Sequence, residues 1–266
     1  YRTWYKNQLK KLLFQMLRDF PEEGIPEQIR RRIPAWGTMT GVRPTKISMN
    51  ELLSGKSREE VRYALLNTYC CSEEKADLGI RIAEREADLL EQIDYENGYS
   101  IYIGIPFCPT TCLYCSFPSY PYEKFGHLAD RYLQALKREI SAVSELRDRK
   151  KVTSIYIGGG TPTTLTASQL EELILHVREC FPAEDSCEFT VEAGRPDSIT
   201  REKLVALRRC GVDRISVNPQ TMQQKTLDLI GRKHTVEQTV QAFQMARELG
   251  FSNKGHFNKM FCEKYG

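Results

Sequence analysis

From residue 99 onward, strand-like and helical runs alternate along the chain, and this alternation limits the possible folds more than any other feature of the sequence. The strands are expected at residues 100–107, 154–157, 188–191 and 214–217, and the helices at 128–146, 167–181, 201–209, 223–230 and 236–249. Four βα units of this kind predict an α/β fold with a parallel sheet, either as part of a (β/α) barrel or as an open doubly wound sheet. In both folds the chemistry takes place at the carboxyl ends of the strands.

The first 95 residues show helical periodicity and no strand-like alternation. Helices are expected at residues 1–20, 57–70 and 72–93, and Ser57 with Glu60 forms a capping-box pattern at the start of the second. Prolines and glycines break the pattern between residues 21 and 56, which we expect to be rich in loops. We therefore divide the chain into a helical region at 1–95, an α/β core at 96–250 and a tail at 251–266 that has no clear period.

The composition excludes several classes of protein. Lys and Arg number 38 against 35 Asp and Glu, and a net charge of only +3 argues against a nucleic-acid-binding protein. No run approaches the roughly 18 apolar residues of a membrane span, and charges interrupt the apolar stretch at residues 9–14, which therefore does not resemble a signal peptide. We expect a cytoplasmic protein with no membrane span, in which the nine cysteines are reduced.

Three of these cysteines, Cys108, Cys112 and Cys115, lie within eight residues directly after the first predicted strand. Three thiolates on one loop can hold an iron–sulfur cluster through three of its irons and leave the fourth iron open to another ligand. Zinc is the main alternative, but a structural zinc site normally takes four ligands and this loop offers three. Buried cysteines that serve only in packing are the second alternative, although packing does not require three of them on one loop.

Glycines follow the second predicted strand, in Gly158-Gly159-Gly160-Thr161. A backbone without side chains lets a ligand approach closely, and its N–H and C=O groups can bind an amino group or a carboxylate. A tight turn between a strand and a helix would use the same residues, so this segment alone does not predict a site.

Polar side chains follow the third and fourth predicted strands and precede the last helix. These are Glu192, Gln220 and Arg232. Each could be a helix cap, a solvated loop residue or part of a basic turn. Because successive strand ends meet at one edge of the sheet, we expect Glu192 and Gln220 to lie beside the cysteine loop, and the guanidinium of Arg232 suits a carboxylate.

The remaining reactive side chains are interpreted as structural. We expect His234 and His256 to be ordinary surface residues and Arg30, Arg31 and Arg32 to form a solvated turn. The cysteines expected to serve in packing are Cys70, Cys71, Cys180, Cys187, Cys210 and Cys262.

In combination these motifs resemble the radical S-adenosylmethionine (SAM) superfamily. They include Tyr102-Ile-Gly-Ile-Pro-Phe-Cys108-x3-Cys112-x-Tyr-Cys115, the segment 158–163, Val191-Glu192 and Ile215-Ser216-x3-Gln220. More narrowly, they are similar to the oxygen-independent coproporphyrinogen III oxidases and their relatives. The segment 36–46 is similar to the coproporphyrinogen dehydrogenases of Gram-positive bacteria.

The resemblance implies a role for each matching residue. The three cysteines would ligate a 4Fe-4S cluster, whose free iron binds SAM through its amino and carboxylate groups. Tyr114 would pack near the adenine, and Gly158, Gly159, Gly160 and Thr161 would bind the methionyl amino end. Glu192, Gln220 and Arg232 match SAM contacts, and Tyr102 matches an active-site tyrosine on the first strand.

The resemblance also implies an activity and partners. One electron from a donor such as a flavodoxin or ferredoxin would lead to cleavage of SAM, and the resulting 5′-deoxyadenosyl radical would abstract a hydrogen atom. The substrate would be coproporphyrinogen III, whose propionate side chains lose carbon dioxide to become the vinyl groups of protoporphyrinogen IX. A radical SAM enzyme that modifies tRNA is a further alternative, but the near-neutral charge speaks against it.

Two departures from the family pattern lead to separate expectations. The oxidases usually carry another cysteine two residues after the third, and Phe117 stands there in this chain, as in the related haem chaperones. The resemblance therefore leaves open the alternative of a haem chaperone-like radical SAM protein that binds haem without oxidase activity. The family also continues after residue 250 into a fifth strand with an aspartate, where this chain has Phe257. A barrel without its last strands has an open edge, so we expect this chain by itself to bind a cluster weakly and to turn over slowly.

Overall fold

The computed structural model describes residues 2–19, 23, 33–41, 43–91, 93, 97–146, 151–182 and 188–251. The chain divides into two compact units, Tyr1–Asp94 and Tyr95–Gly266.

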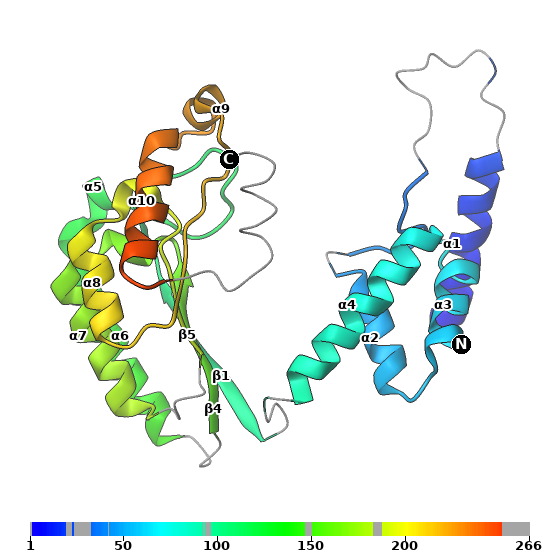
Figure 1. Cartoon of the computed structure of the whole chain (residues 1–266), viewed down its shortest axis with the longest axis horizontal. Coiled ribbons are helices and arrows are strands. Elements are labelled where there is room, and N and C mark those ends of the chain that lie inside the picture. Colours follow the sequence, from blue (N-terminus) through cyan, green and yellow to red (C-terminus); the bar gives the residue numbers. More distant parts are fainter. Residues whose placement is uncertain are drawn as a thin grey trace. The chain divides into compact units, whose positions relative to one another are not determined.

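The first unit is helical, as the sequence predicts. Its helices are α1 (Arg2–Asp19), α2 (Thr45–Leu53), α3 (Arg58–Asn67) and α4 (Glu73–Glu91) (Figure 1). Helix α3 begins with the expected capping box, in which the Ser57 hydroxyl accepts from the Glu60 N–H and the Glu60 carboxylate accepts from the Ser57 N–H. The small hydrophobic core of the first unit consists of Val61, Leu65, Cys71, Ala76 and Ile80.

One expectation for this unit is wrong. Helix α2 lies inside the stretch from 21 to 56 that we expected to be loop-rich, and it packs against α3 and α4. Pro44 directly precedes α2, and the fixed φ of proline suits the start of a helix. Packing against α4, which the local pattern does not reveal, stabilises this short helix.

The second unit contains a four-stranded parallel sheet. Its strands are β1 (Gly98–Ile105), β4 (Lys151–Gly159), β5 (Glu188–Glu192) and β6 (Arg214–Ser216), in the order β1-β4-β5-β6. The neighbours are parallel throughout, and the register pairs Tyr102 with Tyr156 and Ile157 with Val191. Two short strands, β2 (Phe107–Cys108) and β3 (Tyr120–Pro121), form a separate parallel pair.

Helices connect the strands and cover one face of the sheet. Figure 1 shows α6 (Ala129–Glu145), α7 (Ala167–Cys180) and α8 (Arg201–Arg209) along that face, followed in the chain by α9 (Gln224–Leu229) and α10 (Val236–Glu248). Shorter elements complete the unit, namely α5 (Tyr122–Phe125) and the 3-10 turns Gly126–Leu128, Pro162–Thr164 and Pro196–Ser198. In this sheet, the strands β1, β4, β5 and β6 are neighbours in the same order in which they follow one another along the chain. A doubly wound sheet would instead show a reversal of this strand order. The order is therefore that of a (β/α) barrel, and within the described residues β1 and β6 are its two edges.

The two faces of the sheet differ in chemistry. Ile103, Ile105, Ile155, Ile157 and Val191 are buried in the core against the helices. Alternation along a strand turns the intervening residues to the opposite face. Tyr102, Tyr156 and Glu192 are therefore presented together on the face that the helices do not cover.

Several predicted features fall outside the described residues. They are the basic run 30–32, Cys187, Cys262, His256, Phe257 and the tail after residue 251. Among the helices that the structure does describe, none combines the length and apolar character needed to cross a membrane.

Candidate functional site

The three clustered cysteines lie on one loop at the carboxyl end of the sheet. Cys108 ends β2 and is 9% exposed, whereas Cys112 and Cys115 are partly exposed, and all three are free thiols. The Cys115 N–H donates to the Cys112 carbonyl at 3.0 Å, which turns the loop back on itself. Burial raises the pKa of the Cys108 thiol, and the Thr161 hydroxyl, which donates to its sulfur at 3.5 Å, partly offsets that effect.

The geometry of the loop does not match a single-ion site. Tetrahedral zinc holds its thiolates about 2.3 Å from the metal and therefore within about 4 Å of one another. No group of three His, Cys, Asp or Glu side chains in the described part of the chain gathers closely enough for one metal ion. In an iron–sulfur cluster each thiolate binds a different iron, so the three sulfurs need not meet at one point. The described residues therefore offer no preformed tetrahedral zinc site.

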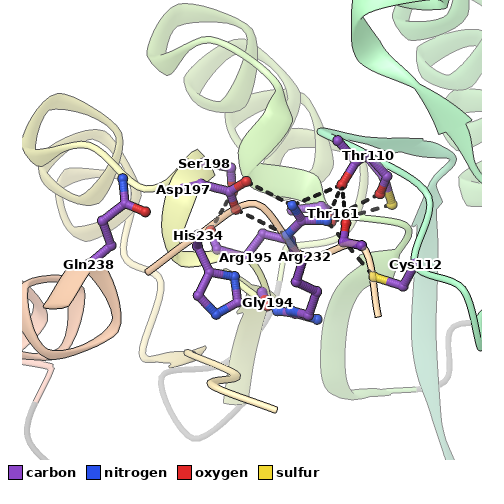
Figure 2. A network of polar contacts seen from close by, with 12 residues as sticks. Thr110, Cys112, Thr161, Gly194, Arg195, Asp197, Ser198, Arg232, His234 and Gln238 are labelled. Carbon is purple, nitrogen blue, oxygen red and sulfur yellow. Dashed lines mark hydrogen bonds and ion pairs between the residues drawn. The ribbon is translucent and has the colours of Figure 1, made fainter. Parts of the chain in front are cut away.

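A buried arginine that the sequence analysis did not identify contacts this loop. Arg195 is 3% exposed and makes a bidentate ion pair with Asp197, at 3.0 and 2.7 Å (Figure 2). Its Nη1 donates to the Thr110 carbonyl at 3.1 Å and to the Cys112 sulfur at 3.9 Å. The Gly-Arg-Pro-Asp sequence after a strand end was the available signal, because an arginine at that edge needs a carboxylate or carbonyl partner.

The glycine segment lies directly against the first cysteine. The Gly160 N–H donates to the Ile105 carbonyl and the Thr161 N–H to the Phe107 carbonyl, both at 2.7 Å. A Cβ on Gly160 would lie 2.9 Å from the Cys108 sulfur and 2.7 Å from the Phe107 oxygen. Glycine is therefore required for this close approach between the glycine segment and the cysteine loop.

Glu192 lies beside the same segment on the uncovered face of the sheet. Its Oε2 would be 3.2 Å from a Cβ on Gly158, so only glycine leaves that space free. Tyr156 donates to Glu192 Oε1 at 2.5 Å, and the Tyr156 and Tyr102 rings stack with centroids 5.8 Å apart. Burial and the Glu192 charge raise the pKa of both phenols. Tyr102 nevertheless remains 65% exposed and faces open space.

Tyr114 connects the cysteine loop to the end of the sheet. Its hydroxyl accepts from Gln220 Nε2 at 2.6 Å and from Arg232 Nη1 at 3.5 Å. Gln220 has a φ of 59°, in the left-handed region that side chains other than glycine avoid. Strain of this kind is typical of functional sites, where surrounding contacts hold the backbone in place.

Arg232 is buried rather than part of a solvated turn. It is 4% exposed, and its Nη2 donates to the carbonyls of Gly194 and Asn218 at 2.6 and 3.0 Å. Its Nε has no partner within the described structure. The guanidinium thus holds the loops after β5 and β6 together and keeps one donor free.

The expectation that His234 is a surface residue is wrong. Its side chain is completely buried, and neither ring nitrogen reaches hydrogen-bond geometry among the described atoms. Burial and the nearby Arg232 charge lower its pKa, which Asp197 and the Pro219 backbone offset in part. The apolar-polar pattern around it gave no signal, because its burial results from loops that meet only in the folded chain.

The other described cysteines agree with a packing role. Cys71 and Cys210 are buried, and burial raises the pKa of both thiols, that of Cys71 to about 11. Cys70 and Cys180 are partly exposed, and neither contacts the cysteine loop in the described structure.

Comparisons with known proteins agree with this geometry. Residues 102–261 match the Radical SAM superfamily. The chain is 42% identical over 222 residues to "Oxygen-independent coproporphyrinogen-III oxidase-like protein HemZ" of Bacillus subtilis, a match that covers 82% of this chain and 44% of that protein. It is 39% identical over 155 residues to "Heme chaperone HemW" of the same species, covering 58% of this chain and 40% of the chaperone.

A solved structure shows the same fold. The structure titled "Coproporphyrinogen III oxidase (HemN) from Escherichia coli is a Radical SAM enzyme" matches with a TM-score of 0.54 and 33% identity, over 57% of this chain and 35% of that one. The chain spans less than half the length of each of these relatives. The family match over more than half of the chain, the parallel α/β sheet and the cysteine and glycine loops at its carboxyl edge together show that the chain belongs to the radical SAM superfamily.

Proposed function

We propose that this protein catalyses the oxygen-independent oxidative decarboxylation of coproporphyrinogen III to protoporphyrinogen IX. The observation that carries the proposal is the extent of the similarity to the HemZ protein. Because 222 aligned residues exceed the whole second unit, Tyr95–Gly266, the similarity extends into the helical first unit. The matches to the haem chaperone and to the E. coli oxidase cover only 58% and 59% of the chain.

Cys108, Cys112 and Cys115 are the proposed ligands of a 4Fe-4S cluster. They supply three free thiols on one loop, and no sulfur among them is committed to a disulfide. The Thr161 hydroxyl donates a hydrogen bond to the Cys108 sulfur, and the Arg195 guanidinium donates one to the Cys112 sulfur. When bound, the cluster and SAM would supply one-electron chemistry that removes a hydrogen atom from the substrate.

The residues on the uncovered face are proposed to bind SAM. Glu192 places a carboxylate beside the space above Gly158, where it would attract an ammonium group, and Tyr156 fixes its orientation. Gly159, Gly160 and Thr161 would offer their backbone to the same methionyl end. Gln220 and Arg232 would act together with Tyr114, which they contact, at the adenosine side.

Tyr102 is proposed to face the porphyrinogen. It is exposed on the uncovered face of β1 and stacks on Tyr156, so one side of its ring remains open to a substrate. Electrons would come from a small redox protein such as a flavodoxin or ferredoxin. The partly exposed Cys112 and Cys115 would place the cluster close enough to the surface to receive them.

A haem chaperone is the second candidate, and Phe117 favours it. The side chain at this position, where we expect a cysteine in the oxidases, is 70% exposed and offers no ligand. An exposed aromatic ring of this kind could contact haem. Such a protein would use the same cluster loop and release no carbon dioxide.

Anaerobic turnover distinguishes the two candidates. The reconstituted protein is incubated with SAM, dithionite and coproporphyrinogen III, and carbon dioxide and protoporphyrin are measured after oxidation. In parallel, the absorbance change on adding haem is titrated. The proposal predicts carbon dioxide release that Cys108→Ala abolishes. Haem binding without release of carbon dioxide would favour the chaperone. If the protein neither released carbon dioxide nor bound haem, both candidates would be contradicted.

A further inference from the structure

The Arg195 side chain uses its full set of donors at the base of the cysteine loop. Asp197 accepts from Nε and Nη2, and the Thr110 carbonyl and the Cys112 sulfur accept from Nη1. The Thr110 hydroxyl lies 3.1 Å from both Nη atoms. A planar fork with five N–H groups fits this arrangement, whereas the single ammonium of a lysine could not reach all of these acceptors.

These contacts join three segments that are far apart in the chain. Thr110 belongs to the cysteine loop, Arg195 follows β5, and the Thr110 hydroxyl donates to the Gly231 carbonyl at 3.0 Å. The Leu113 N–H also donates to the Ile230 carbonyl at 2.9 Å. The loop is therefore fixed on both sides of Cys112 before any ligand binds to it, as Figure 2 shows for the Arg195 side.

The charge of Arg195 is almost fully removed from water. Its side chain is 3% exposed and that of Asp197 is 16% exposed. Separating a buried ion pair leaves an uncompensated charge, which is energetically costly, so the Arg195–Asp197 pair holds the guanidinium in one orientation. Its N–H toward Cys112 is thus aimed by the structure and not by a flexible side chain.

We propose that Arg195 is a positioning residue for the iron–sulfur cluster, which it serves in two ways. It holds residues 109–115 in the ligand-binding conformation, and its hydrogen bond to the Cys112 sulfur makes the bound cluster easier to reduce. Hydrogen bonds to cluster sulfurs and local charge are among the factors that set the reduction potential. Both roles rest on the proposed cluster site, but the role of Arg195 in holding residues 109–115 can be measured in the protein without a cluster.

The test begins with the protein free of iron. Hydrogen exchange of amides 110–115 is measured in the wild type, in Arg195→Gln and in Arg195→Lys. The expected result is at least tenfold faster exchange in both variants, because neither can rebuild the fork. Arg178→Gln is the matched control, since Arg178 also donates to two backbone carbonyls, at 2.7 and 2.6 Å, but far from this loop. It should leave exchange at 110–115 unchanged.

The second readout is the midpoint potential of the reconstituted cluster, followed by EPR during a redox titration. A hydrogen bond to a charged group is worth about tenfold or more in an equilibrium constant. We expect Arg195→Gln to shift the midpoint by about 59 mV to more negative values, which corresponds to tenfold for one electron. Arg195→Lys, which keeps the charge, should shift it less, and Arg178→Gln should not shift it.

The outcomes separate this inference from the proposed function. Unchanged exchange at 110–115 in Arg195→Gln would overturn the positioning role, and an unchanged midpoint potential would overturn the effect on cluster reduction. A wild type that binds no cluster would contradict the proposed function, while the exchange data would still decide the role of Arg195. If the Arg195 variants do not fold, Thr110→Val removes the bonds through its hydroxyl and keeps the Arg195–Asp197 pair. It is expected to accelerate exchange in the same segment, and no acceleration would count against the inference.

Discussion

Gly160→Ala is expected to destabilise the second unit, because a methyl group has no space at this position. Its Cβ would lie 2.7 Å from the Phe107 oxygen, 2.9 Å from the Cys108 sulfur and 3.0 Å from the Ile105 oxygen. Ordinary contact requires about 3.4 Å, so the strand ends must separate by about half an ångström. Two of these atoms are backbone carbonyls in 2.7 Å hydrogen bonds, to Gly160 and Thr161, and cannot yield as a flexible side chain would.

The size of the effect follows from three contributions. Overpacking typically costs about 1–3 kcal/mol, and weakening two hydrogen bonds adds about 1 kcal/mol. The alanine variant has lower conformational entropy in the unfolded state, which offsets about 0.4–1 kcal/mol of this destabilisation. A net loss of about 2 kcal/mol is expected, which lowers Tm by about 4–8 °C in a unit of this size.

Gly104→Ala is the matched control on the neighbouring strand. Its Cβ would meet only the Tyr102 ring, at 3.7 Å, which is an ordinary contact. It should leave stability unchanged or raise it by up to about 1 kcal/mol. Both tryptophans, Trp4 and Trp36, belong to the first unit, so hydrogen exchange of the β4 amides in urea is the suitable probe. Equal stability of the two variants would refute the close approach at Gly160.

Three further predictions concern single side chains. Burial lowers the pKa of His234, so its contribution to the free energy of unfolding should be complete above the pKa of about 6.5 that histidine has in the unfolded chain. As the pH falls below this value, stability should decrease by at most about 1.4 kcal/mol per pH unit. His234→Gln should remove this pH dependence in urea titrations at pH 5–8, and an unaltered dependence would contradict the burial of His234. Tyr156→Phe should weaken SAM binding several-fold in calorimetry by freeing the Glu192 carboxylate, and equal affinity would show that the hydrogen bond does not orient it. Ser57→Ala should cost about 1 kcal/mol in the first unit, measured by tryptophan fluorescence, while Ser54→Ala, outside the capping box, should cost less.

Strands and helices of the second unit could be predicted closely from the sequence. Residues 201–209 form a helix with the expected bounds, and the third strand ends one residue later than expected. The first predicted strand is divided into β1 and β2 at Pro106, because proline has no N–H to donate to a ladder. Local periodicity sufficed for these elements, since each buries one regular face.

The candidate site could be predicted only in part. The cysteine and glycine motifs lie together because they follow neighbouring parallel strands. Arg195 and Thr110 are 85 residues apart in the chain, so no local pattern links them. The burial of His234 and Arg232 likewise depends on contacts between loops, for which sequence periodicity carries no signal.

The three cysteines are proposed to hold an iron–sulfur cluster that binds SAM. The most direct measurement is EPR of the anaerobically reconstituted and reduced protein, with and without SAM, beside Cys108→Ala and the packing-site control Cys210→Ala. We expect a 4Fe-4S signal that shifts when SAM is added, that is absent in Cys108→Ala and that is present in Cys210→Ala. A signal that persists in Cys108→Ala, or that does not respond to SAM, would contradict it.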